Sequence, residues 1–109
     1  DHNAPNVEHL EATHEKMFMQ IRKTFPKLPI ILMTAPCYIP SEKMAARSKV
    51  IEKTYNNAIA KGDKNIYFID GPTLMAFAKN EGTVDDCHPT DLGFASMAKA
   101  VINILKKII

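Results

Sequence analysis

A carboxylate and an imidazole stand near the C-terminal end of the sequence with the spacing of an acid–base pair. They are Asp85 and His88, within Val84–Phe94 (VDDCHPTDLGF). A histidine that takes a proton from a nucleophile works best when a carboxylate fixes its tautomer and stabilises the imidazolium. The spacing lets Asp85 and His88 meet on one loop, and the neighbouring Asp86 is the second choice for the carboxylate.

Taken alone, an Asp-x-x-His pattern favours a simpler interpretation. In that interpretation Asp85 or Asp86 ends a turn, and His88 is an exposed loop residue before Pro89. The choice between a catalytic pair and a turn therefore depends on the sequence around the pair.

That surrounding sequence resembles the last motif of the SGNH (GDSL-type) hydrolases. In this motif Asp-x-x-His-Pro, a small polar residue and a glycine-containing helix start follow the final strand. Segments 65–70 (NIYFID) and 81–94 (EGTVDDCHPTDLGF) are similar to those of carbohydrate-esterase-like members. At the other end, residues 1–6 (DHNAPN) resemble the block that ends in the oxyanion-hole asparagine, which falls on Asn6. The usual Gly-x-Asn-Asp is not kept, because Ala4 stands at the glycine and Val7 follows the asparagine.

The nucleophile block of these hydrolases has no counterpart in residues 1–109. The serines are Ser41, Ser48 and Ser96, and none stands in a Gly-Asp-Ser or Gly-x-Ser-x-Gly setting. The glycine block that supplies a second oxyanion donor is missing as well. The resemblance therefore implies a single domain, 1–109, that is the C-terminal part of an SGNH hydrolase domain truncated at its N-terminal side.

The activity that the resemblance implies is serine-type ester hydrolysis through an acyl-enzyme. The substrate would be a small-molecule ester such as an O-acylated carbohydrate, and neither a metal nor an organic cofactor is expected. His88 would be the general base, Asp85 would orient it, and Asn6 would donate to the oxyanion. The isolated chain should be inactive without the serine. The alternative is a non-catalytic α/β binding or interaction module. A secreted or periplasmic location is implied by the resemblance alone.

Composition and charge describe an ordinary folded domain. Hydrophobic residues make up 46% of the chain and charged residues 24%, and the formal net charge of +2 comes from interspersed Lys and Glu. This pattern does not favour nucleic-acid binding, and no apolar run is long enough to cross a bilayer. His9 and His14 do not share a helical face, and Cys37 and Cys87 fit no zinc pattern. The two cysteines are expected as free thiols, with a Cys37–Cys87 bridge as the alternative.

Hydrophobic periodicity and cap residues predict alternating helices and strands. A helix over Val7–Thr24, capped by Asn6, carries an apolar stripe of Val7, Leu10, His14, Met17, Phe18 and Ile21. A buried strand over 29–34 is followed by a helix from Ser41 to about Lys61, with Arg47 on its outer side and Gly62 ending it. A strand over 65–70 precedes a turn at Asp70 and a short helical piece over 73–78. The last helix begins near Thr90 or Asp91 and turns Leu92, Ala95, Ala98, Val101, Ile102 and Leu105 inward.

This order of elements predicts an α/β fold with a parallel sheet. Right-handed crossovers place helices on both faces, which gives a three-layer α/β/α sandwich of the flavodoxin-like kind found in SGNH hydrolases. Two strands are too few for a stable open sheet. We therefore expect strands from outside this sequence at one sheet edge, and self-association of the isolated chain through that edge.

Overall fold

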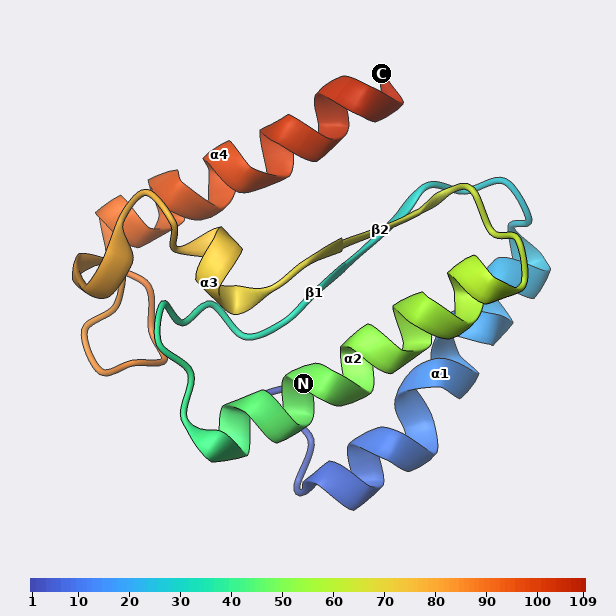
Figure 1. The fold of residues 1–109 in the computed structure, drawn as a ribbon, viewed down its shortest axis with the longest axis horizontal. Coiled ribbons are helices and arrows are strands. Elements are labelled where there is room, and N and C mark those ends of the chain that lie inside the picture. The colour runs from blue at the N-terminus through green and yellow to red at the C-terminus, as the bar shows by residue number, and fades with distance from the viewer.

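The computed structural model describes residues 1–109 and confirms the α/β architecture. The elements in chain order are α1 (Val7–Thr24), β1 (Ile30–Met33), α2 (Glu42–Ala60), β2 (Ile66–Ile69), α3 (Gly71–Leu74), the 3-10 helix η1 (Lys79–Gly82) and α4 (Asp91–Ile108). The two strands pair in parallel, from Ile30 opposite Ile66 to Met33 opposite Ile69. Helices α1 and α2 lie on one side of the sheet and α4 on the other (Figure 1). The sheet is thus the middle of three layers, as predicted.

Side-chain caps fix the helix starts where the sequence predicts them. Ser41 Oγ accepts the Met44 N–H at 3.2 Å, and Thr90 Oγ1 accepts the Gly93 N–H at 3.1 Å. Gly62 ends α2 in the left-handed region, with a φ of 87°. The short helix predicted over 73–78 lies earlier, at Gly71–Leu74, because the Asp70 carboxylate caps it by accepting the Thr73 N–H at 2.8 Å.

The main core lies between the sheet and the α1–α2 layer. Its buried members are Leu10, Phe18, Leu32, Val50, Ile51, Ala58 and Ile66. His14 is partly buried beside this core, and its Nδ1 lies 2.8 Å from Thr54 Oγ1. Burial lowers the His14 pKa, and the N-terminal ammonium group lowers it further. His14 is therefore a structural histidine with a hydrogen-bond partner, consistent with its place in the apolar stripe of α1.

The apolar stripes of the outer helices are less covered than predicted. In α1, Met17 and Ile21 are exposed, and in α4 Leu92, Ile102 and Leu105 are exposed although their spacing predicts burial. Only Gly93 and Ser96 are buried in α4. A two-stranded sheet is too narrow to cover a helix along its whole stripe, which explains both differences. None of the helices is both long and apolar enough to span a membrane.

The outer edge of β1 motivates a prediction about the chain in solution. Ile30 donates to Asn65 O and Thr34 to Ile69 O, so alternation in a parallel ladder points the Ile31 and Met33 backbone groups away from β2. An open edge beside exposed apolar side chains favours pairing with another chain. We expect concentration-dependent self-association of residues 1–109 in sedimentation velocity. Met33→Lys, which puts a charge at this exposed edge position, should shift the chain toward monomer. A monomer at every concentration would contradict the expectation.

Candidate active site

The loop between η1 and α4 carries Asp85 and His88 and is closed by backbone bonds. Val84 donates to His88 O at 3.0 Å, and Thr90 donates to Gly82 O at 2.9 Å. These bonds tie the two ends of the loop together, so its side chains lie on a fixed turn rather than on a flexible segment.

Two glycines let the start of α4 approach η1 closely enough for this arrangement. A Cβ added at Gly93 would lie 2.0 Å from Gly82 O, closer than any real contact allows. At Gly82 an added Cβ would lie 2.4 Å from Met75 Sδ. Gly93, in the first turn of α4, is therefore required by the close packing of α4 against η1. This packing fixes the position at which the loop joins α4.

The Asp85 carboxylate uses both of its oxygens on the loop. Oδ1 accepts the backbone N–H groups of Cys87 at 3.0 Å and His88 at 2.7 Å. Oδ2 lies 2.6 Å from His88 Nδ1. The turn interpretation and the pair interpretation thus hold together, since one carboxylate closes the turn and also orients the imidazole. Asp86, the second choice for the carboxylate, adopts a left-handed φ of 62° and makes no hydrogen bond to His88, whose Nδ1 is bound by Asp85.

The imidazole of His88 is presented with one nitrogen free. An ionised carboxylate only accepts hydrogen bonds, so Nδ1 is the donor, and in the neutral ring Nε2 then keeps its lone pair. The His88 side chain is 74% exposed and that of Asp85 52% exposed. Exposed ion pairs contribute little to stability, so the pairing matters for orientation. None of the five main cavities is lined by either residue, and in this chain the ring faces solvent.

The hydrogen bonds to Asp85 lead to a titration prediction. The backbone N–H of His88 is the largest cause, and the His88 side chain the next, of an Asp85 pKa below its usual value. A lowered folded-state pKa stabilises the fold above the unfolded-state pKa, and this contribution is lost as pH falls through the folded-state pKa. In carbon-detected NMR, the Asp85 carboxyl should titrate below the usual pKa of an aspartate. His88→Ala keeps the backbone donor and should raise the Asp85 pKa only in part. An Asp85 that titrates at the usual value would show that these bonds are not formed.

Asn6 caps α1, which is the structural role that the sequence predicts for it. Its Oδ1 accepts the His9 N–H at 2.8 Å, and its backbone is extended, with a φ of −155°. Because the partner is a backbone donor, the accepting atom of the amide must be the oxygen. The Nδ2 group of Asn6 therefore takes no part in the helix cap. The cap is confirmed, and an oxyanion role for Nδ2 is compatible with it but stays a prediction.

The first residues of the chain run from the end of β1 to the Asp85–His88 loop. Asp1 Oδ2 accepts the N–H of Ala35, which follows β1, at 3.0 Å. His2 Nε2 lies 3.2 Å from Cys87 Sγ. The N-terminal segment therefore links the carboxyl end of β1 to the loop, at the sheet edge where open α/β sheets bind ligands.

Arg47 holds this N-terminal segment, although the sequence interpretation placed it on the outside of its helix. The residue is 8% exposed, and its Nη1 donates to the carbonyl oxygens of Asp1 at 2.6 Å and Ala4 at 2.7 Å. The spacing to Ile51 and Ala58 is helical and could have placed Arg47 on the buried face. The charge of Arg47 concealed this signal, since charged residues are seldom buried.

Replacing Arg47 by methionine should destabilise the fold. Methionine keeps much of the apolar stem but leaves the carbonyls of Asp1 and Ala4 without their charged donor. The expected loss is about 3 kcal/mol, at about 1.5 kcal/mol for each short bond to a charged group. Urea unfolding followed by circular dichroism measures it. The matched control is Lys53→Met on the exposed side of α2, which should change stability by less than about 0.5 kcal/mol. Equal effects of the two substitutions would contradict this role of Arg47.

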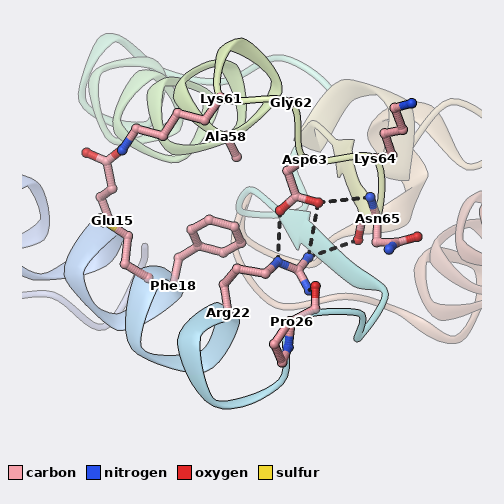
Figure 2. A pocket seen from close by; sticks show the side chains of 11 residues that line it. Glu15, Phe18, Arg22, Pro26, Ala58, Lys61, Gly62, Asp63, Lys64 and Asn65 are labelled. Carbon is pink, nitrogen blue, oxygen red and sulfur yellow. Dashed lines mark hydrogen bonds and ion pairs between the residues drawn. The ribbon is translucent and has the colours of Figure 1, made fainter.

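The largest cavity lies at the other end of the strands and has a structural explanation. It measures about 470 Å³ and lies beside the turn before β2 (Figure 2). Arg22 Nε pairs with Asp63 Oδ2 at 2.8 Å, and Arg22 Nη2 donates to Asn65 O at 3.2 Å. These bonds hold the end of α1 to the start of β2.

No serine hydroxyl in residues 1–109 reaches His88. Ser41 is a helix cap, Ser48 lies within α2, and Ser96 is buried with its Oγ donating to Leu74 O at 2.7 Å. Both cysteines are free thiols, as expected. The site therefore contains an imidazole paired with a carboxylate, without a serine hydroxyl beside them.

Comparison with known proteins places these features in a family. The profile of the GDSL-like lipase/acylhydrolase family matches residues 3–106, which include Asn6, Asp85 and His88. The chain belongs to this family. Comparison with curated proteins gives no match for this GDSL-like chain.

Two solved structures share the fold of this GDSL-like chain. A Bacteroides ovatus protein described as a GDSL-like lipase is 27% identical, with a TM-score of 0.75, and the match covers 95% of this chain and 33% of that protein. The salicylyl-acyltransferase SsfX3 of a tetracycline biosynthetic pathway is 18% identical, with a TM-score of 0.69 and coverages of 94% and 33%. The chain therefore spans about a third of the length of each of these structures.

Proposed function

We propose that this GDSL-like chain supplies the general base and an oxyanion donor of a serine-type ester hydrolase. The supporting observation is the 2.6 Å contact between Asp85 Oδ2 and His88 Nδ1, which leaves Nε2 free to take a proton. Family membership supports acylhydrolase chemistry at the level of the whole family.

The proposed reaction proceeds through an acyl-enzyme. A serine from outside residues 1–109 attacks the ester carbonyl while His88 Nε2 takes the hydroxyl proton. The Asn6 Nδ2 group donates to the oxygen that becomes negative. The protonated Nε2 then gives its proton to the leaving alcohol. A water molecule repeats the sequence at the acyl-enzyme, with Nε2 as base again. Asp85 remains ionised throughout and stabilises the imidazolium.

The proposed substrate is a small ester, with an O-acylated carbohydrate as the specific candidate. The resemblance of segments 65–70 and 81–94 to carbohydrate-esterase-like members supports this choice. An exposed pair on a surface loop also suits an ester group that protrudes from a larger polar molecule. Release of acetate from an O-acetylated sugar, compared with turnover of a short-chain aryl ester, tests this choice separately from the mechanism.

The second candidate is a binding or interaction module that keeps the fold without the reaction. The observation in its favour is that no serine of residues 1–109 reaches His88. The two candidates differ in what a longer polypeptide, extended upstream of Asp1, can do.

A serine-directed fluorophosphonate distinguishes them. The 1–109 chain should not be labelled, whereas the extended polypeptide should be labelled at one serine upstream of Asp1 and should hydrolyse the aryl ester. His88→Ala in the extended polypeptide should slow the labelling. Labelling of Ser41, Ser48 or Ser96 would show that the nucleophile lies within residues 1–109 and not upstream of Asp1. An extended polypeptide that is neither labelled nor active would favour the binding module.

A further inference from the structure

The two cysteines lie in different environments, and only one has a base beside it. Cys87 is partly exposed, and its Sγ lies 3.2 Å from Nε2 of His2, which is 85 positions away in the sequence. Cys37 is 3% exposed, and its Sγ donates to Ile39 O at 3.3 Å. A thiol and an imidazole within hydrogen-bond reach are the arrangement that activates a cysteine nucleophile.

Both partners of this contact lie in segments that hydrogen bonds hold in place. Asp1, next to His2, accepts the Ala35 N–H through its carboxylate and the Arg47 guanidinium through its carbonyl. Cys87 donates its N–H to Asp85 Oδ1 at 3.0 Å. The contact therefore joins two held segments, and it is not explained by the Asp85–His88 pair, which uses other atoms.

We propose that Cys87 and His2 form a reactive thiol–imidazole pair that takes up a small disulfide, so that a reversible adduct forms beside the Asp85–His88 pair. The modification itself is independent of the proposed ester hydrolysis. The adduct would change the surroundings of the His88 ring, because Cys87 and His88 are adjacent and donate their N–H groups to the same Asp85 oxygen.

The exchange step is balanced in atoms and electrons. His2 Nε2 takes the proton from Cys87 Sγ, and the thiolate attacks one sulfur of a small disulfide. The sulfur–sulfur bond of the reagent breaks while the Cys87–sulfur bond forms. The departing thiolate takes the proton from the His2 imidazolium. An excess of a small thiol reverses the step and restores Cys87.

The test uses the 1–109 chain and needs no ester turnover. Cys37→Ala leaves Cys87 as the single thiol, and Cys87→Ala leaves Cys37 as the matched control. With dithiobis(nitrobenzoate), an aromatic disulfide, Cys87 should react at least about 10-fold faster than Cys37, because it combines exposure with a base. In urea the two rates should become similar, which assigns the difference to the fold.

The role of His2 is tested in the Cys37→Ala background. His2→Gln should lower the Cys87 rate near neutral pH by about 3-fold or more and should remove part of its pH dependence, while His9→Gln should change neither. An unchanged rate with His2→Gln would overturn the pair, as would a folded-state Cys87 that reacts no faster than Cys37. A Cys87 methyl disulfide should also shift the His88 ring signals in NMR, and unshifted His88 signals would overturn the placement of the adduct.

Discussion

Replacing His88 by alanine in the upstream-extended polypeptide is expected to lower kcat/KM for a short-chain aryl ester by about 10²- to 10⁴-fold. The loss arises because no other group in the loop can take the serine proton from the position of Nε2. His9→Ala is the matched control, since His9 is also exposed. The His9 N–H that binds Asn6 is a backbone group, so alanine keeps the helix cap. Comparable losses in the two variants would contradict the assignment of His88.

The neighbouring carboxylates refine this test. Asp85→Asn removes the charge that orients His88, whereas Asp86→Asn keeps a residue type that tolerates the left-handed conformation of position 86. We expect a large loss of kcat from the first substitution and little change from the second. A larger loss from Asp86→Asn would reverse the assignment of the orienting carboxylate.

Replacing Asn6 by aspartate should separate its cap from its proposed catalytic role. Aspartate keeps the oxygen that accepts the His9 N–H and is a good N-cap, but it has no amide donor for an oxyanion. We expect kcat in the extended polypeptide to fall by about 10²- to 10³-fold, as for the loss of one oxyanion donor. The free energy of unfolding should change by less than about 0.5 kcal/mol.

Asn6→Ala completes the comparison because it removes both groups. It should lose the same activity and, in addition, about 1 kcal/mol of stability from the missing cap. If Asn6→Asp retained full activity while Asn6→Ala lost only stability, Asn6 would be a helix cap without a part in the reaction.

Features set by neighbouring residues could be predicted from the sequence. The bounds of α1, the caps at Asn6, Ser41 and Thr90, and the left-handed Gly62 depend on contacts within four residues or on backbone preference. The Asp85–His88 pair is local in the same sense, since one turn brings its members together.

Features set by distant segments could not be predicted in this way. Arg47 is buried because it binds carbonyls of residues 1–4, and no periodicity in α2 indicates that partner. The contact of His2 with Cys87 joins opposite ends of the chain. The exposure of Leu92 and Ile102 reflects the width of the sheet, which helix periodicity does not contain.

The most direct test of the account is the tautomer of His88 in the 1–109 chain, measured by long-range proton–nitrogen NMR at a pH where the ring is neutral. We predict a proton on Nδ1, held by Asp85 Oδ2 at 2.6 Å, and a bare Nε2 that can act as base. Asp85→Ala should remove this preference for Nδ1. A neutral His88 that carries its proton on Nε2 in the unmodified chain would contradict the account, because the nitrogen assigned to catalysis could not accept a proton.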